Sequence, residues 1–322
     1  MRYVEVGGVR LSAIGLGTWQ FGSREWGYGS AYAEHDALDI VARALDLGIN
    51  LIDTAEIYAF GRSERIVGQA LAGRRDEAFL ATKLFPVVPV PPVMEQRAKG
   101  SIRRLGVDQL DLYQLHWPNP VVPIGPTMAG MRQLRRSHLV RNVGVSNFSL
   151  GAWRQAEETL GAPVLSNQVQ YSLAARAPEK DLLGWAQAND RLIIAYSPLA
   201  QGFLSGRYSA EHPPGGLRAV GSLFLPENLE RGAPLLSALQ DIAKVHDATA
   251  AQVALAWVIR RPNVVAIPGA SSVAQLESNA AAVDLELTDD EDARLTSASD
   301  AFEPVSGPAA LPKIVETLLR RV

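Results

Sequence analysis

The sequence contains no cysteine among its 322 residues. This absence excludes disulfide bonds, a catalytic thiol and every zinc site that uses thiolate ligands. A chain without cysteine suits a reducing compartment, and its first ten residues, MRYVEVGGVR, lack the apolar core of a signal peptide. We therefore expect a soluble cytoplasmic protein.

Long apolar runs and an excess of charge of one sign are also missing. Stretches such as Val253–Ile259 are far shorter than the ~20 residues needed to cross a bilayer. The chain has 31 Lys and Arg residues and 34 Asp and Glu residues, and its net charge of −3 provides no basic field for nucleic acid or an anionic membrane. Neither partner is expected. Hydrophobic residues at 47% and charged residues at 20% are typical of a globular chain.

Short apolar runs alternate with longer stretches of helical period along most of the chain. Residues 36–47 are typical of the helical stretches, because Ala37, Val41 and Ala44 share one face while Arg43 lies on the other. Parallel strands need such crossovers. Strands are predicted at residues 13–17, 50–53, 78–83, 109–116, 140–145, 164–169, 192–196 and 264–267.

Eight βα units in about 300 residues predict a closed (β/α)8 TIM barrel, formed by a single domain over residues 1–322. The main alternative is an open doubly wound sheet, whose dinucleotide fingerprint needs a third glycine after the first strand. Residues 15–19, Gly-Leu-Gly-Thr-Trp, do not provide it. The closed barrel is therefore favoured.

Three segments lie outside the regular alternation. Residues 3–11 predict an N-terminal β-hairpin with a Gly7-Gly8 turn. Residues 197–232, rich in Gly and Pro, are predicted as a long βα loop. The C-terminal segment 301–322 is expected to be either another cover over the barrel or a frayed end.

Polar side chains stand at the ends of three successive predicted strands. Asp53 ends the second strand, Lys83 the third and His116 the fourth, and Tyr58 follows in the loop after Asp53. The carboxyl ends of barrel strands meet at one mouth, where active sites lie. Each residue alone has an ordinary structural explanation, such as a turn cap or a packed core histidine. Together, the four indicate a catalytic site.

The chemistry of these four groups suits proton delivery to a carbonyl oxygen. An ammonium favours the phenolate form of a nearby tyrosine, so Lys83 is expected to lower the pKa of Tyr58 from its usual ~10. Asp53 is expected to keep Lys83 charged and oriented, and His116 to hydrogen-bond a substrate oxygen or relay a proton. Because no cysteine and no Ser-His-Asp order supplies a nucleophile, hydride from a nicotinamide is the simplest reactant.

The chain resembles the aldo-keto reductases over residues 16–279. The motifs that carry the resemblance are GLGTW at 15–19, NLIDTAEIY at 50–58, GRSE at 61–64, ATK at 81–83, LYQLHWP at 112–118, VGVSNF at 143–148, NQVQY at 167–171, AYSPLAQGFLSGRY at 195–208 and IPGAS at 267–271. The resemblance implies a (β/α)8 barrel that binds extended NADPH without a Rossmann domain. It also implies a catalytic tetrad of Asp53, Tyr58, Lys83 and His116, with Tyr58 as general acid for carbonyl reduction and general base in reverse.

The resemblance further implies where cofactor and substrate bind. The positions implied to bind the nicotinamide are Ser146, Asn147 and Gln168, with Tyr196 stacking on its ring. The segment after Tyr196 is implied to bind the pyrophosphate. The other implied cofactor positions are Gly17, Thr18, Trp19, Asp53, Ser197, Pro198, Leu199, Gln201, Gly202, Ile267, Gly269, Ser271, Gln275 and Asn279. The implied substrate positions are Trp19, Tyr58, Phe85, His116 and Trp117, and no metal is expected.

One stretch departs from the family pattern. Many NADPH-dependent relatives carry Lys or Arg near the IP-motif to hold the 2′-phosphate, since anion recognition favours charged donors. Here the stretch 267–279 offers Ser271, Ser272 and Gln275 instead. A helix predicted to start near Ser272 still presents amides and a dipole to a phosphate. NADP(H) is therefore the expected cofactor, with NAD(H) as the alternative.

Two other functions stay open at this point. The chain is also similar to the potassium-channel β-subunits of the same fold, so a non-catalytic NADP(H)-binding sensor or regulatory subunit is an alternative to an enzyme that reduces a small-molecule carbonyl substrate. A metal-dependent hydrolase or isomerase would need several His and carboxylate ligands at strand ends. Of the five histidines, His116 alone lies at a predicted strand end.

Overall fold

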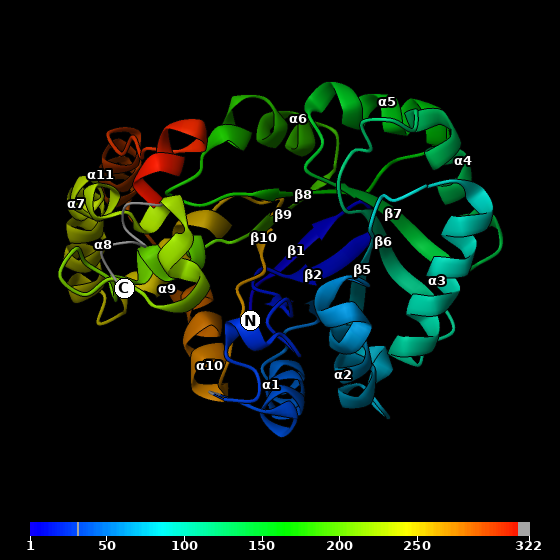
Figure 1. The fold of residues 1–322 in the computed structure, drawn as a ribbon, viewed down its shortest axis with the longest axis horizontal. Helices are drawn as coiled ribbons and strands as arrows, with labels where there is room; N and C mark the ends of the chain where they lie inside the picture. Colours follow the sequence, from blue (N-terminus) through cyan, green and yellow to red (C-terminus); the bar gives the residue numbers. More distant parts are fainter. Residues whose placement is uncertain (31, 315–322) are drawn as a thin grey trace.

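The computed structural model describes residues 1–30 and 32–314. Eight parallel strands form one curved sheet in the order β10-β9-β8-β7-β6-β5-β4-β3, so each strand lies next to its neighbour in sequence (Figure 1). The strands are β3 (Leu16–Gly17), β4 (Leu51–Asp53), β5 (Phe79–Leu84), β6 (Leu110–Leu115), β7 (Val140–Ser146), β8 (Ser166–Gln170), β9 (Leu192–Tyr196) and β10 (Val264–Ala266). All eight predicted strands are confirmed, although the first is shorter than expected.

Backbone hydrogen bonds between the first and last strands close the barrel. Gly15 N donates to Ala266 O at 2.8 Å, and Gly17 N donates to Pro268 O at 3.1 Å. A Cβ atom on Gly17 would lie 2.7 Å from Ile267 O, so only glycine allows the two chains to approach this closely. The predicted (β/α)8 barrel is confirmed.

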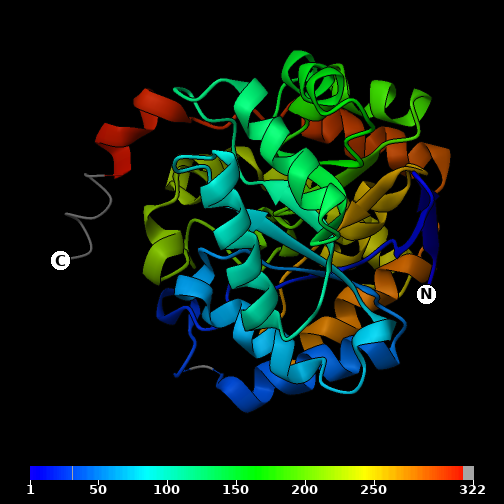
Figure 2. The same ribbon diagram turned by 90° about the vertical axis from the view of Figure 1, so that its right-hand side faces the viewer.

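Helices surround the barrel on its outer side (Figures 1 and 2). The first of them buries Ala37, Val41 and Ala44, as its sequence period predicts. The helices are α1 (Glu34–Asp46), α2 (Arg62–Ala70), α3 (Pro91–Leu105), α4 (Ile124–Arg136), α5 (Leu150–Leu160), α6 (Leu182–Ala188), α7 (Pro226–Arg231), α8 (Ala233–Val245), α9 (Ala250–Ile259), α10 (Val273–Ala281) and α11 (Asp289–Asp300). Strands β9 and β10 are apolar on both faces because the helices cover one side and the barrel interior the other.

The predicted N-terminal hairpin is confirmed as β1 (Tyr3–Val6) and β2 (Val9–Ser12), which pair antiparallel. The amide nitrogen of Ser12 donates to the Asn50 side chain at 2.7 Å, just before β4 begins. The hairpin therefore lies at the amino-terminal ends of the strands. The opposite end of the barrel is left for the loops that carry the polar residues.

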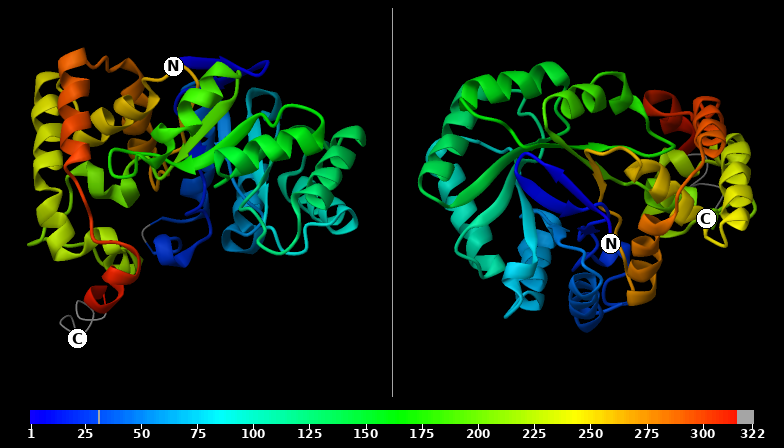
Figure 3. Two further views of the ribbon diagram at one scale, coloured as in Figure 1. Left: turned by 90° about the horizontal axis from the view of Figure 1, so that it is seen from above. Right: turned by 180° about the vertical axis from the view of Figure 1, so that it is seen from behind.

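The predicted loop 197–232 joins β9 to α8 but is not structureless, because it contains short 3-10 turns and the helix α7. Residues 301–314 lie against this helix, where the Asn228 side chain bonds both the nitrogen and the oxygen of Val305, at 2.8 and 2.9 Å. Figure 3 shows this segment after it leaves α11. The rest of the predicted C-terminal segment, residues 315–322, lies outside the described residues.

Within residues 1–30 and 32–314, no helix combines the length and the hydropathy needed to cross a membrane.

Candidate active site

The four predicted catalytic side chains meet at the carboxyl ends of β4, β5 and β6. Asp53 is the last residue of β4, Lys83 lies near the end of β5, and His116 directly follows β6. Tyr58 opens a short 3-10 turn after β4. Its hydroxyl accepts a hydrogen bond from Lys83 Nζ at 3.1 Å, and its ring lies edge-on to the His116 ring with centroids 5.8 Å apart. The structure thus brings together all four residues.

Lys83 is completely buried and uses all three of its ammonium donors. They reach Asp53 Oδ1 at 2.5 Å, Thr54 O at 3.0 Å and the Tyr58 hydroxyl. Burial lowers the pKa of Lys83, but the Asp53 carboxylate and Tyr58 raise it more, so that its pKa lies above the ordinary value. The amine therefore stays charged.

The second oxygen of Asp53 has partners from across the barrel. Gln168 Nε2 of β8 donates to Asp53 Oδ2 at 2.8 Å, and Gln114 Nε2 of β6 approaches the same oxygen at 3.4 Å. Ser166 Oγ in turn donates to Gln114 Oε1 at 3.3 Å. The sequence interpretation missed Gln114. Its available signal is a polar side chain in the fully buried strand LDLYQL.

The hydroxyl of Tyr58 is held in its protonated form. Burial raises the pKa of Tyr58, and although Lys83 lowers it as expected from the sequence, the net pKa lies above the ordinary value. The lowering by Lys83 is thus present as expected, but desolvation of the phenolate outweighs it. A protonated Tyr58 beside Lys83 can donate a proton to an oxygen that gains negative charge.

His116 is a neutral imidazole in this site. Burial and the nearby Lys83 ammonium lower its pKa to about 3. Its Nδ1 atom is buried and has no hydrogen-bond partner among the described residues. Of the two roles considered for His116, a neutral ring at physiological pH suits a hydrogen bond to a substrate oxygen better than proton relay.

Aromatic side chains surround the tetrad on the side of the barrel mouth. The Trp19 ring stacks on the Tyr58 ring with centroids 5.7 Å apart, and the Trp117 ring stacks on the His116 ring at 4.0 Å. Phe85 lies edge-on to Trp117 at 5.6 Å. The predicted substrate residues therefore lie together, and the two partly exposed tryptophans form apolar walls next to the reacting groups.

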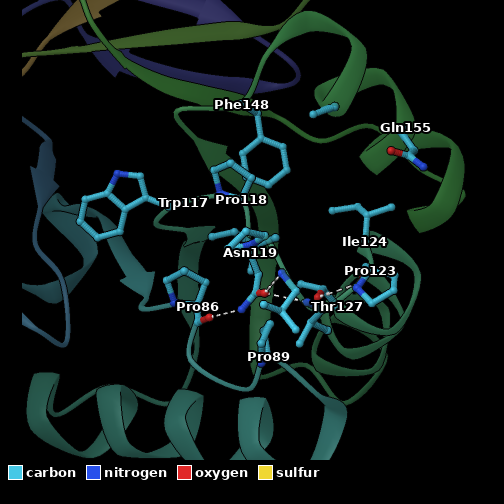
Figure 4. A pocket seen from close by; sticks show the side chains of 15 residues that line it. Pro86, Pro89, Trp117, Pro118, Asn119, Pro123, Ile124, Thr127, Phe148 and Gln155 are labelled. Atoms are coloured by element: carbon cyan, nitrogen blue, oxygen red, sulfur yellow. Dashed lines mark hydrogen bonds between the residues drawn. The ribbon is translucent and has the colours of Figure 1, made fainter. Parts of the chain in front are cut away.

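A cavity of about 330 Å³ borders Trp117 on the outer side of the mouth (Figure 4). The side chain of Asn119 fixes its wall, since Oδ1 accepts hydrogen bonds from Val121 N and Val122 N and Nδ2 donates to Pro86 O at 2.6 Å. The cavity is lined mainly by apolar side chains: Pro86, Pro89, Leu115, Trp117, Pro118, Pro120, Val121, Val122, Pro123, Ile124, Phe148 and Ala152.

The predicted nicotinamide residues form one hydrogen-bonded network. Tyr196 donates to Asn147 Oδ1 at 2.9 Å, Asn147 Nδ2 donates to Ser146 Oγ at 3.0 Å, and Ser146 Oγ donates to Gln168 O at 2.8 Å. The side chain of Gln168 continues to Asp53. The amide groups beside the tetrad can hydrogen-bond a carboxamide, so this cluster fits a nicotinamide ring.

The segment predicted to hold the pyrophosphate has an unusual backbone. Ser197, Ala200 and Gln201 have φ angles of 49°, 48° and 58°, and left-handed residues in such turns direct N–H groups into concavities that bind anions. Arg218 Nε donates to Gln201 O at 2.9 Å and so brings positive charge to this segment. The sequence interpretation missed Arg218. The feature that could have indicated it is a positively charged residue within the long Gly- and Pro-rich loop. Pro198, Leu199 and Gly202 lie in the same turn.

At the predicted 2′-phosphate position, the side chains already take part in hydrogen bonds within the protein. Gln275 Oε1 accepts a hydrogen bond from Ser271 N at 2.9 Å, and Ser272 Oγ accepts one from Gln275 N at 3.2 Å. Asn279 Nδ2 donates to Gly269 O at 3.3 Å. Helix α10 begins at Val273 with Ser272 as its N-cap, which confirms the predicted helix start.

Three other predicted cofactor positions lie in the barrel closure. Gly17 and Ile267 form the close contact between the first and last strands. Thr18 Oγ1 donates to Asp53 O at 2.9 Å and contacts Ser63 Oγ at 2.8 Å, so its side chain is turned into the protein.

In the part of the chain that the structure describes, no group of three or more His, Asp and Glu side chains is placed to hold a metal ion.

Comparisons with known proteins agree on one family. A family model described as the Aldo/keto reductase family matches residues 13–300. An uncharacterized oxidoreductase of Mycobacterium tuberculosis is 53% identical over all of both chains, and the methylglyoxal reductase YeaE of Escherichia coli is 36% identical over 96% of this chain and 97% of its own. An aldo/keto reductase from Klebsiella pneumoniae, solved in complex with NADP and acetate, is 33% identical with a TM-score of 0.75 and covers 95% of this chain and 96% of its own.

Proposed function

Since the chain belongs to the Aldo/keto reductase family, we propose that it is an NADP(H)-dependent reductase that converts aldehydes or ketones to alcohols. The observation that supports this function most is Lys83, a buried ammonium held between the Asp53 carboxylate and the Tyr58 hydroxyl. A charged amine costs several kcal/mol to bury, so a site that retains one next to a phenol is organised for proton transfer.

Each residue of the tetrad has a separate role in the proposed reaction. When bound, the nicotinamide supplies the hydride for the carbonyl carbon. The neutral imidazole of His116 hydrogen-bonds the carbonyl oxygen, and Tyr58 donates its proton to that oxygen as negative charge develops. Lys83 stabilises the phenolate that remains, while Asp53 holds Lys83 in place. Trp117 and its neighbours limit the access of water to the reacting groups.

The proposed cofactor is NADP(H). The network from Tyr196 to Gln168 fits the nicotinamide, and the left-handed turn after β9 together with Arg218 fits the phosphates. The solved Klebsiella pneumoniae relative in complex with NADP supports the same choice. At the 2′-phosphate the chain offers serine and glutamine rather than a cation, which makes NAD(H) the competing cofactor.

The test is an assay of NADPH oxidation over a panel of aldehydes and ketones, which includes methylglyoxal because of the Escherichia coli relative. We expect turnover with members of the panel. Tyr58→Phe should lower kcat about 10²- to 10⁴-fold, the usual contribution of general acid catalysis, while the Kd for NADPH changes less than about twofold. Turnover that survives in Tyr58→Phe contradicts the role of Tyr58. Tight NADPH binding without turnover of any carbonyl identifies a sensor rather than an enzyme.

A further inference from the structure

The ion pair between Glu56, in the loop that follows β4, and Arg97, in helix α3, lies outside the tetrad. Arg97 donates to the Glu56 carboxylate twice, at 2.5 and 3.1 Å, and its third hydrogen bond reaches Val87 O at 3.1 Å. The same carboxylate accepts a hydrogen bond from Phe85 N at 2.6 Å. The two side chains are only 10% and 23% exposed, so solvent screens this bidentate pair weakly.

The pair is attached close to the two residues whose separation matters for proton transfer. Glu56 precedes Tyr58 by two positions, and Phe85 follows Lys83 by two positions. The hydrogen bond from Phe85 N to Glu56 therefore connects the chain just before Tyr58 with the chain just after Lys83. The connection therefore lies two residues from each partner of the 3.1 Å contact between Lys83 Nζ and the Tyr58 hydroxyl.

Both loops contain strained backbone next to this connection. Ala59 and Phe60, directly after Tyr58, have φ angles of 46° and 54°, and Val88 has a φ angle of 49°. Left-handed conformations cost such residues roughly 1–2 kcal/mol each, and the cost is greatest for a β-branched side chain. Strain of this kind persists only where surrounding contacts hold the chain. The Glu56–Arg97 pair supplies such contacts to both loops.

The pair also influences the substrate side of the mouth. Phe85, whose nitrogen is bonded to Glu56, lies edge-on to the His116 ring at 6.4 Å and to the Trp117 ring at 5.6 Å. The position of its ring therefore depends on a backbone that the ion pair holds. Glu56 is thus two residues from Tyr58 in sequence. Through the hydrogen bond from Phe85 N, its carboxylate is also connected to the backbone two residues after Lys83 and to the aromatic ring beside His116.

We propose that Glu56 and Arg97 form a positioning pair that sets the geometry of Tyr58, Lys83 and Phe85 for catalysis. The inference rests on the proposed reductase function. Neither residue touches the reacting atoms, and both act through their hydrogen bonds to the loop after β5 and through the loop after β4 that carries Glu56. Misplacement of reacting groups by about 1 Å can cost about 10²-fold in rate, so a tether of this kind has a large effect on kcat.

A second buried Glu–Arg pair, with one hydrogen bond between its side chains instead of two, provides a control at the opposite end of the barrel. Arg191 Nε donates to Glu157 Oε1 at 2.5 Å, the same oxygen accepts Val164 N at 2.9 Å, and Arg191 Nη1 donates to Asn189 O at 2.6 Å. Its side chains are similarly buried, at 18% for Glu157 and 16% for Arg191. This pair lies before β8 and β9, away from the mouth.

The experiment compares Glu56→Gln and Arg97→Met with Glu157→Gln and Arg191→Met in the full chain. Steady-state kinetics with NADPH and a carbonyl from the panel, NADPH titration and thermal unfolding are measured for each variant. For Glu56→Gln and Arg97→Met we expect kcat to fall about 10- to 100-fold, with the Kd for NADPH within about twofold of the wild type. The control variants Glu157→Gln and Arg191→Met should show a similar decrease in Tm but keep kcat within about twofold of the wild type. Arg97→Lys should recover part of the lost kcat, because it keeps the positive charge and can donate to Glu56 but cannot bond both of its oxygens in the same geometry.

A second measurement reads the Tyr58–Lys83 contact without turnover. In a ¹³Cζ-tyrosine NMR titration, the Tyr58 signal is assigned by its absence in Tyr58→Phe. Lys83, Asp53, Tyr196 and His116 face the hydroxyl, and of these Lys83 lowers the pKa of Tyr58, so that pKa should rise in Arg97→Met.

The proposal is overturned if kcat and the pKa of Tyr58 are unchanged in both Glu56→Gln and Arg97→Met. It is also overturned if Glu157→Gln and Arg191→Met lose as much kcat as those two variants. A wild-type chain that reduces no carbonyl refutes the proposed function instead. In that case the tyrosine titration alone decides whether the pair positions Tyr58.

Discussion

The tetrad end and the 2′-phosphate end of the proposed cofactor site are built on opposite principles. At the tetrad, Lys83 and Asp53 are buried and every donor of the amine is bonded within the protein. At the 2′-phosphate position, Ser271 is partly exposed and Gln275 is exposed, and both side chains are uncharged. The amide nitrogen of Ser271 donates to the Gln275 side-chain oxygen. A buried charge requires an opposite charge at a defined place, whereas exposed neutral donors can exchange their partners for a ligand. The first end is therefore rigid in its chemistry, and the second is adjustable.

The largest effect is expected at the rigid end. Lys83→Met leaves the buried Asp53 carboxylate without its charged partner, which costs about 3–5 kcal/mol of unfolding free energy and removes carbonyl reduction. Urea unfolding and single-turnover kinetics measure the two losses. The double variant Asp53→Asn with Lys83→Met should regain part of the stability and none of the activity. If Lys83→Met changes the unfolding free energy by less than about 1 kcal/mol, the ammonium is not essential to the tetrad end of the site.

An intermediate effect is expected from His116 as the pH falls. Its pKa is about 3 in the folded chain and near its ordinary 6.5 in the unfolded chain, so the unfolded state binds more protons between these values. Stability should therefore decrease as the pH falls through this window, by up to about 1.4 kcal/mol per pH unit. Urea unfolding between pH 4 and 7 measures the slope.

His116→Asn should flatten that slope because it removes the titrating ring. Substitution of the well-exposed His35 by asparagine serves as the control and should leave the slope as it is. A slope that is equal in wild type and His116→Asn would show that other groups carry the acid sensitivity.

The smallest effect is expected at the adjustable end. Gln275→Arg places a guanidinium at the first turn of α10, and we expect the preference for NADPH over NADH to rise about three- to tenfold. Titration of both cofactors gives the ratio. Ala274→Arg adds the same charge one position away on the same helix and separates geometry from net charge. An unchanged ratio in Gln275→Arg means that another group, such as Arg218, holds the 2′-phosphate.

The difference between the two ends also explains what could be predicted from the sequence. Strand ends that carry Asp53, Lys83 and His116 are visible because ionisable side chains interrupt apolar runs, and the barrel brings them together by its own symmetry. Gln114 was missed because its partner, Asp53, is 61 positions away and a neutral side chain carries little signal. The net pKa direction of Tyr58 depends on how deeply the ring is buried, which no local pattern contains.

The same limit applies to the loops. The helix α7 was missed because six residues give too short a period to recognise. The hydroxyl of Thr18, a predicted cofactor position, turns toward Ser63, a direction that depends on how the barrel closes. Such choices are made by tertiary contacts, not by the residues next to them.

The closure between Gly15 and Ala266 has a consequence for the synthesis of the chain. These residues come from the two ends of the barrel sequence, so the ring of strands stays open until nearly the whole protein has left the ribosome. Until β10 arrives, β3 and β9 are free edges whose unpaired backbone groups can pair with other chains. We therefore expect the nascent protein to be vulnerable to association during this interval, and a chain that stops before Val264 to keep that vulnerability permanently.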